Sequence, residues 1–155
     1  MRGMEIIQQE KFMKKALAEA EKAKAIDEVP IGAVIVQNGK VIAKAYNKRN
    51  KGKIATHHAE ILAIEKACKK IGDWRLENCE IYVTLEPCPM CAGAIANARI
   101  KKLVFGAYDT AGTNKNLLSD ILQDTRLNHK VEIEGGVLEE ECRNILTTFF
   151  KAKRK

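Results

Sequence analysis

Two cysteines and a histidine–glutamate pair are the residues of this sequence whose types and spacing could do chemistry. Cys88 and Cys91 lie in the stretch TLEPCPMC, directly after an apolar run. Earlier in the chain, the stretch THHAEILAI carries His57, His58 and Glu60. Thiolates at the start of a helix are stabilised by the positive end of the helix dipole, and they can bind a metal ion or form a reversible disulfide.

The cysteine pair alone leaves a redox and a metal interpretation open. Cys-x-x-Cys after a strand and at the start of a helix is also the arrangement of thioredoxin-like proteins. A structural zinc site normally has a second Cys-x-x-Cys or a histidine pair. Cys68, Cys79 and Cys142 each stand alone, and we interpret them as small core residues.

The upstream motif favours the metal interpretation. His58, Cys88 and Cys91 make a zinc site with one position free, and a catalytic zinc keeps that position for water. Glu60 could take the proton of this water and hand it to a substrate nitrogen. Neighbouring helical residues point about 100° apart, so His57 and His58 cannot both easily bind one ion. We choose His58 because it gives the His-x-Glu spacing.

Strands that alternate with helices must position these motifs. Such an order predicts a sheet with parallel neighbours and helices on both faces, which binds ligands where strands end and helices begin. Asn38-Gly39 between two apolar runs is a strong hairpin signal. The expected elements are a helix at 4–25, a hairpin at 29–47, a helix at 58–72, a strand at 80–86, a helix at 88–99, a strand at 101–107, a short helix at 117–122, a strand at 130–136 and a helix at 138–155.

Length and composition indicate one domain over 1–155 with a short basic tail at 151–155. The chain has 155 residues, of which 46% are hydrophobic, so a single core is feasible. Its five cysteines are an odd number, which does not indicate a disulfide framework. The charged, amphipathic beginning predicts no leader peptide, and no apolar run approaches the roughly 18 residues of a membrane span. We therefore expect a cytoplasmic protein without a membrane partner.

Positive charge is concentrated in two segments. The formal net charge is +7, and no acidic residue occurs between Glu28 and Glu60. Such one-signed stretches favour a polyanionic partner such as nucleic acid, although a solvated loop and a frayed tail would look similar. The residues that we expect to contact an RNA backbone are Lys48, Arg49, Lys51, Lys53, Lys151, Lys153 and Arg154.

These motifs resemble a known family. His58-Ala59-Glu60 followed by PCPMC at 87–91 is similar to the zinc-dependent cytidine and deoxycytidylate deaminase superfamily. The segments VPIGAVIV, HAEILAI, ARIKKLVFGA and LNHKVEI resemble its adenosine branch, the bacterial tRNA-specific adenosine deaminases, from about Lys11 to Lys151. The resemblance implies a three-layer α/β/α cytidine-deaminase-like fold with one mixed sheet of about five strands.

The resemblance also implies an activity and partners. These are hydrolytic deamination of adenosine to inosine at the wobble position of tRNA, binding of the anticodon stem-loop, a homodimer and one zinc ion (Zn2+) per subunit. His58, Cys88 and Cys91 match the family's ligands, and Glu60 matches its proton shuttle.

Four further positions match substrate-binding residues of the family. Asn47 resembles the base-contacting asparagine, and the backbone at Ala59 and Cys88 would hold the leaving edge of the base. Asp109 resembles an aspartate of the substrate loop, and Asn128 resembles an anticodon-contacting residue. For Asn47, Asp109 and Asn128 an ordinary role in turns is the alternative.

The chain departs from the family pattern at two places. Alanine is usual where His57 stands. The loop after Asp109 has Ala111 for a lysine, and its usual small residues are replaced at 113–114 and 116–117. These differences leave a deaminase of a free nucleobase or nucleoside (guanine, cytosine or a modified purine) as the alternative function. A zinc-stabilised RNA-binding module without catalysis is a further alternative, against which Glu60 argues.

Overall fold

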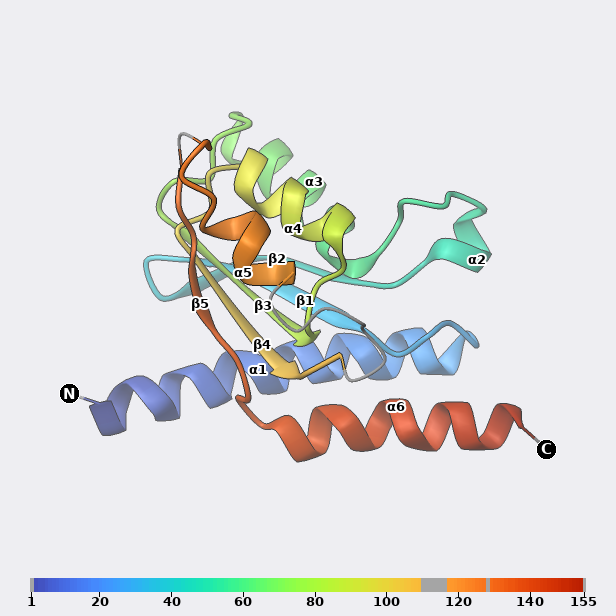
Figure 1. Ribbon diagram of the computed structural model, residues 1–155. Helices are drawn as coiled ribbons and strands as arrows, with labels where there is room; N and C mark the ends of the chain where they lie inside the picture. Colours follow the sequence, from blue (N-terminus) through green and yellow to red (C-terminus); the bar gives the residue numbers. More distant parts are fainter. Residues whose placement is uncertain (1, 110–116, 128, 155) are drawn as a thin grey trace.

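The computed structural model describes residues 2–109, 117–127 and 129–154 and centres on a five-stranded sheet in the order β2-β1-β3-β4-β5 (Figure 1). β1 is antiparallel to both of its neighbours, whereas β3, β4 and β5 run parallel. The mixed α/β fold expected from the sequence is therefore confirmed. The strands are β1 (Gly32–Gln37), β2 (Lys40–Tyr46), β3 (Cys79–Leu85), β4 (Lys102–Ala107) and β5 (Glu132–Glu134).

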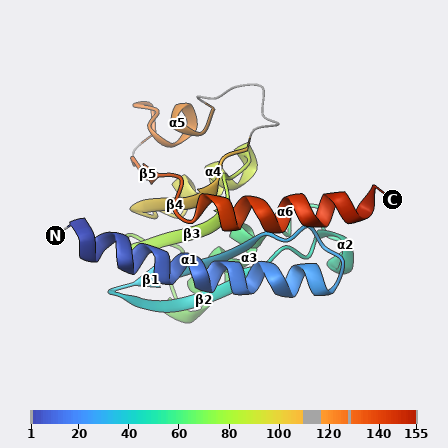
Figure 2. The same ribbon diagram turned by 90° about the horizontal axis from the view of Figure 1, so that it is seen from below.

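Helices cover both faces of the sheet. α3, α4 and α5 lie on one face, and α1 and α6 lie side by side on the other (Figures 1 and 2). The helices are α1 (Arg2–Ala25), α2 (Arg49–Gly52), α3 (Ala59–Ile71), α4 (Pro89–Asn97), α5 (Leu117–Leu122) and α6 (Glu139–Lys153). Each expected helix is present, and α2 is an addition that the apolar pattern did not predict.

Alternation along the strands divides the core into two layers. In β1, Ala33 and Ile35 pack with the α3–α4 side, whereas Val34 and Val36 pack with Phe12 on the α1 side. Successive side chains of a strand point to opposite faces, so a continuously apolar strand can serve both layers. This explains why apolar residues in β1 do not alternate with polar ones.

The hairpin turn has the expected chemistry. Asn38 and Gly39 both have positive φ, 52° and 76°. This backbone matches the twist of the two flanking strands, and glycine adopts it without a steric penalty. The turn thereby fixes the pairing of β1 with β2, which ends at Tyr46 directly before Asn47.

None of the helices in the described part of the chain combines the length and the apolar character that a membrane crossing requires.

Candidate active site

The amino termini of α3 and α4 bring the two sequence motifs together. His58 and Cys88 are the N-cap residues of these helices, and both have extended backbone. The His58 side chain makes no capping hydrogen bond to α3, and the Cys88 side chain bonds to Cys91 within α4. Their side chains are available to each other and to a ligand at the positive ends of two helix dipoles.

One nitrogen and two sulfur atoms converge at this point. Nδ1 of His58 lies 3.6 Å from Sγ of Cys88 and 3.6 Å from Sγ of Cys91. The three ligand atoms all lie within 4.8 Å of one another. An imidazole with two thiolates is a donor set that suits zinc, and three protein ligands leave a position free. The residues chosen from the sequence thus form a group that can hold a metal ion.

Glu60 lies next to this group in the first turn of α3. Its side chain is buried, with 4% exposed, and the Cys91 thiol is one of its hydrogen-bond partners. Burial disfavours the charged carboxylate and raises the pKa of Glu60 to about 7. A carboxyl group of this kind is suited to accept and to return a proton near neutral pH.

The hydrogen bond between the two cysteines shifts their pKa values in opposite directions. Hydrogen bonds from Cys91 and from His58 lower the pKa of Cys88 to about 4. The Cys91 pKa is raised, first by its hydrogen bond to Cys88 and then by burial. The His58 pKa is raised by its hydrogen bond to Cys88, while the nearby charge of Arg49 acts to lower it. Metal ligation requires deprotonated thiols, so binding of a cation by this group would release protons.

Asn47 lies directly after β2, beside the segment that leads into α3. It is 6% exposed, and its Oδ1 is buried without a hydrogen-bond partner among the described residues. Its backbone N–H donates to Ile31, and the next residue, Lys48, donates to the carbonyl of His57 at 3.1 Å. These bonds fix Asn47 beside the segment that carries His58. Buried polar atoms without partners are uncommon, so Oδ1 marks an acceptor available to a ligand.

Asp109 and Ala59 also lie at this end of the sheet. The Asp109 backbone N–H donates to Glu86 Oε1 at 2.9 Å, two residues before Cys88, and its side chain is exposed. Ala59 is fully buried between His58 and Glu60. Asn128 lies outside the described residues, as does the altered loop at 110–116.

The basic residues chosen from the sequence form two exposed segments at the same end of the molecule. α2 and the carboxyl terminus both lie at the end where α3 and α4 begin (Figures 1 and 2). Lys48 is half-buried, with its ammonium 4.8 Å from the centre of the Tyr46 ring. The exposed members are Arg49, Lys51, Lys53, Lys151, Lys153 and Arg154.

Two acidic residues at this end were missed by the sequence reasoning. Glu86 holds the backbone of Asp109, and Glu28 accepts the backbone N–H groups of Asn50 and Lys51. Every residue except proline offers a backbone N–H, so no residue type could have indicated these pairings in advance.

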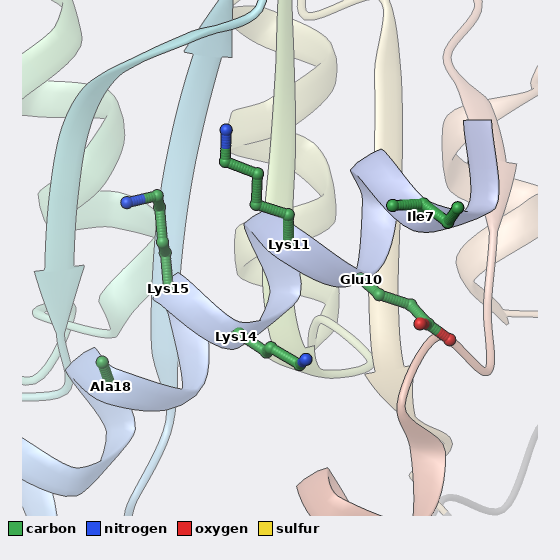
Figure 3. A pocket seen from close by; sticks show the side chains of 6 residues that line it. All are labelled: Ile7, Glu10, Lys11, Lys14, Lys15 and Ala18. Atoms are coloured by element: carbon green, nitrogen blue, oxygen red, sulfur yellow. The ribbon is translucent and has the colours of Figure 1, made fainter. Parts of the chain in front are cut away.

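A separate shallow hollow lies along the outer side of α1, on the opposite face of the sheet. Ile7, Glu10, Lys11, Lys14, Lys15 and Ala18 line it (Figure 3). These side chains include no cysteine or histidine and only one carboxylate. The hollow therefore offers no counterpart to the chemistry of the His58 group.

Comparisons with known proteins identify the family. The model of the MafB19-like deaminase family matches residues 7–154. The tRNA-specific adenosine deaminase of Bacillus subtilis (strain 168) is 52% identical over 148 residues, which cover 96% of this chain and 92% of that protein.

Solved structures agree with this assignment. A structure from work on A-to-I editing by tRNA:A34 deaminases has a TM-score of 0.81 and 43% identity, and the match covers 87% of this chain and 98% of that one. A guanine deaminase of Nitrosomonas europaea shares the fold, with a TM-score of 0.79 and 24% identity over 90% of this chain and 83% of that one. With half of its residues identical to an adenosine deaminase over nearly the full length of both chains, this protein belongs to the family of tRNA-specific adenosine deaminases.

Proposed function

We propose that the protein hydrolyses adenosine to inosine and ammonia at the wobble position of tRNA. The observation that carries this proposal is the group His58, Cys88 and Cys91 with buried Glu60 beside it, in a chain 52% identical to a tRNA-specific adenosine deaminase. The reaction consumes one water molecule for each adenosine and needs no redox step. It therefore requires an activated nucleophile and a group that moves protons.

The metal ion of the proposal is zinc, with one ion per subunit held by His58, Cys88 and Cys91. A zinc ion in this place would supply the Lewis acidity that makes water nucleophilic near neutral pH. The sulfur-rich donor set supports zinc over magnesium or calcium, which prefer oxygen ligands.

Glu60 is the proposed proton shuttle. Its carboxylate would remove a proton from the attacking water and deliver it to a ring nitrogen of adenine, and a second transfer would release the amino group as ammonia. Burial excludes bulk water from the carboxyl group, and a pKa of about 7 leaves both protonation states available near neutral pH. Its place in the first turn of α3 fixes it two residues beyond His58.

The base would be held by groups around this carboxylate. Asn47 Oδ1 offers a buried acceptor to an N–H or O–H group of the nucleoside. The backbone at Ala59 and Cys88 belongs to two helix amino termini, which carry N–H groups without helical partners. Asp109 and Asn128 are proposed to contact the neighbouring nucleotides, as their counterparts in the resemblance imply.

The positive segments are proposed to bind the backbone of the anticodon stem-loop. Segments 48–53 and 151–154, which carry the cationic side chains, include α2 and the last turn of α6, and both lie at the end of the molecule where α3 and α4 begin (Figure 1). Lysine and arginine contacts to phosphates position a nucleic acid without reading its sequence. A tRNA substrate also implies a cytoplasmic enzyme, with residues 1–155 acting as a single deaminase domain.

A homodimer is part of the proposal. A hollow beside α4 has a mixed lining of apolar, polar and cationic residues: Gly93, Ala96, Asn97, Arg99, Ile121, Arg126, Leu127 and His129. The exposed apolar side chains of Leu127 in this lining and of Met90 on α4 support contact with a second copy of the chain. Light scattering at micromolar concentration should give the mass of two chains, and a monomer there would contradict the dimer.

A comparison of substrates tests the function directly. The zinc-loaded protein is incubated with a tRNA that has adenosine at the wobble position, with the same tRNA carrying guanosine there, and separately with adenosine, cytidine and guanine. Mass spectrometry should find inosine in the first tRNA and no comparable conversion of the free compounds. Deamination of a free base or nucleoside at the higher rate would favour the alternative function.

The catalytic role is separated from simple RNA binding by Glu60→Gln. The variant should lose about a thousandfold in rate, because general acid–base catalysis contributes roughly a hundred- to ten-thousandfold. Metal content and tRNA affinity should stay within about twofold of the parent protein. A variant as fast as the parent would leave the zinc-stabilised RNA-binding module as the better description.

A further inference from the structure

Glu28 is a buried carboxylate that the proposed reaction does not use. It lies between α1 and β1, is 1% exposed, and accepts the backbone N–H of Asn50 at 3.2 Å. Its second oxygen accepts the N–H of Lys51. No lysine, arginine or histidine among the described residues forms an ion pair with it by distance. The contacts of this buried charge are therefore directed at a backbone segment.

That segment is the first turn of α2, which has no cap of its own. The N-cap residue is Lys48, whose side chain makes no capping hydrogen bond and carries no acceptor. An oxygen acceptor at this point normally satisfies the free N–H groups of the first turn. Glu28 supplies it from a distant part of the chain, and its negative charge lies at the positive end of the turn.

Apolar packing does not hold α2 in place. None of its residues is buried. Besides the Glu28 contacts, the described bonds of this segment include Lys48 N–H to His57 and Gly52 N–H to Lys48. Among the described residues, the two bonds to Glu28 are therefore the hydrogen bonds that tie the residues of α2 itself to the body of the molecule.

The turn that Glu28 holds carries positive charge next to the candidate active site. Arg49, Lys51 and Lys53 are exposed, and the backbone N–H of Lys48, directly before α2, donates to the carbonyl of His57, directly before His58, at 3.1 Å. No acidic residue lies between Glu28 and Glu60 in the sequence. Where α2 lies thus decides where these cations meet a bound polyanion.

We propose that Glu28 is a positioning residue for the RNA substrate: by capping α2 from within the protein, it holds the cations of 48–53 where the phosphates next to the target nucleotide bind. This inference rests on the proposed function. Glu28 does not touch the substrate and acts through the backbone of Asn50 and Lys51.

The neighbouring residue supplies a matched control. Asp27 carries the same charge, but it is 69% exposed and pairs with exposed Lys153. An exposed pair of this kind contributes little to structure. If charge alone mattered, Glu28→Gln and Asp27→Asn would both bind RNA more tightly, because each removes a negative charge near phosphates. Positioning predicts the opposite sign for Glu28→Gln.

The experiment measures KM and kcat of zinc-loaded, full-length variants on the anticodon stem-loop over a range of salt concentrations. In Glu28→Gln the amide nitrogen would face one N–H donor with another donor, which breaks one of the two bonds. KM should rise about tenfold with kcat within about threefold, and the slope of log KM against log salt should fall by about one to two. Asp27→Asn should match the parent or lower KM slightly.

A second variant keeps the negative charge but shortens the side chain that carries it. Glu28→Asp shortens the side chain by one methylene, so the carboxylate cannot hold both N–H groups in place. KM should again rise several-fold, which a pure charge effect does not predict. This variant also decides the matter if Glu28→Gln does not fold, as judged by circular dichroism and zinc content.

Two failures can be told apart. A parent protein that does not deaminate the stem-loop contradicts the proposed function, and the role of Glu28 falls with it. The positioning role alone is overturned if the parent is active but the variants show no loss. In that case Glu28→Gln behaves like Asp27→Asn, and Glu28→Asp behaves like the parent.

Discussion

At the scale of single residues, Asn47 has a buried amide oxygen that we propose serves substrate binding at a cost in stability. Its Oδ1 is buried and has no partner among the described residues. Leaving a buried polar atom unsatisfied costs about 1–3 kcal/mol in the free protein. A bound nucleoside that donates to this oxygen would recover that free energy in the complex.

Replacement of this amide should therefore separate stability from activity. In Asn47→Ala we expect the free energy of unfolding to stay within about 1 kcal/mol of the parent, because the lost contacts are offset by removal of the unsatisfied oxygen. The value of kcat/KM should fall about tenfold to a hundredfold. Urea unfolding and stem-loop kinetics measure the two effects, with exposed Asn78→Ala as the control. A loss of stability of about 3 kcal/mol with unchanged kinetics would assign Asn47 a structural role instead.

The two adjacent histidines should differ in metal binding. Nδ1 of His58 lies 3.6 Å from both candidate sulfur ligands, whereas the backbone carbonyl of His57 is bonded to Lys48. After dialysis, His57→Ala should keep about one zinc ion per chain and His58→Ala should keep almost none. Elemental analysis by mass spectrometry makes the comparison. Full retention by the His58 variant would show that the wrong histidine was chosen.

The side chains of the candidate metal group could be predicted from the sequence, and those that hold the backbone could not. Cys88, Cys91 and His58 were identified because their types and spacing are unusual outside metal sites. Glu28 and Glu86 act on backbone N–H groups, which leave no trace in residue types. The lack of a hydrogen-bond partner for Asn47 Oδ1 also depends on the folded structure around it, so the neighbouring residues in the sequence could not predict it.

At the scale of elements, apolar periodicity was sufficient for the strands and the long helices. It failed at α2, which has four residues, no buried side chain and a cap supplied from outside the segment. The expected strand at 130–136 is present as three residues, Glu132–Glu134, because an edge strand needs only the pairing of one neighbour. Elements that depend on one distant contact are therefore the ones that local patterns miss.

Close packing of α1 on β1 gives a prediction at this scale. A Cβ on Gly32 would overlap the backbone oxygen of Ala16 and approach the backbone nitrogen of Ala20. In Gly32→Ala the helix must move away from the sheet, and we expect a loss of about 3 kcal/mol in the free energy of unfolding.

The matched control is Gly3→Ala in α1, where a Cβ meets nothing within 4 Å. Alanine within a helix should stabilise the protein by about 0.5–1 kcal/mol relative to glycine. Denaturant unfolding of both variants measures the difference. Equal effects of the two substitutions would mean that α1 does not pack against Gly32 as closely as described.

At the scale of the whole molecule, the arrangement of charge matters more than its sum. The segments 48–53 and 151–154 come from different parts of the chain and lie at one end of the molecule (Figures 1 and 2). Lys69 and Lys70 lie in the last turn of α3, at the end of that helix opposite His58. Two pairs of lysines in segments 48–53 and 151–154 can thus be compared with the pair Lys69 and Lys70, because replacing any one pair removes the same amount of charge.

We expect binding of the stem-loop to weaken steeply with added salt, because phosphate contacts release counterions. Neutralising Lys51 and Lys53 together, or Lys151 and Lys153 together, should lower the slope of log affinity against log salt by about one to two. The pair Lys69 and Lys70, changed to glutamine in the same way, should leave it unchanged. Fluorescence anisotropy at several salt concentrations gives the slopes, and three equal slopes would show that net charge alone determines binding.

The course of α1 has a practical consequence for anyone who handles the protein. This helix of 24 residues spans about 36 Å and begins at the end of the molecule away from α2, whereas α6 finishes at the same end as α2 (Figure 1). An affinity tag, a fluorophore or a fused enzyme is therefore best joined at the amino terminus. The same cargo at the carboxyl terminus would stand beside the segments that we propose to bind tRNA.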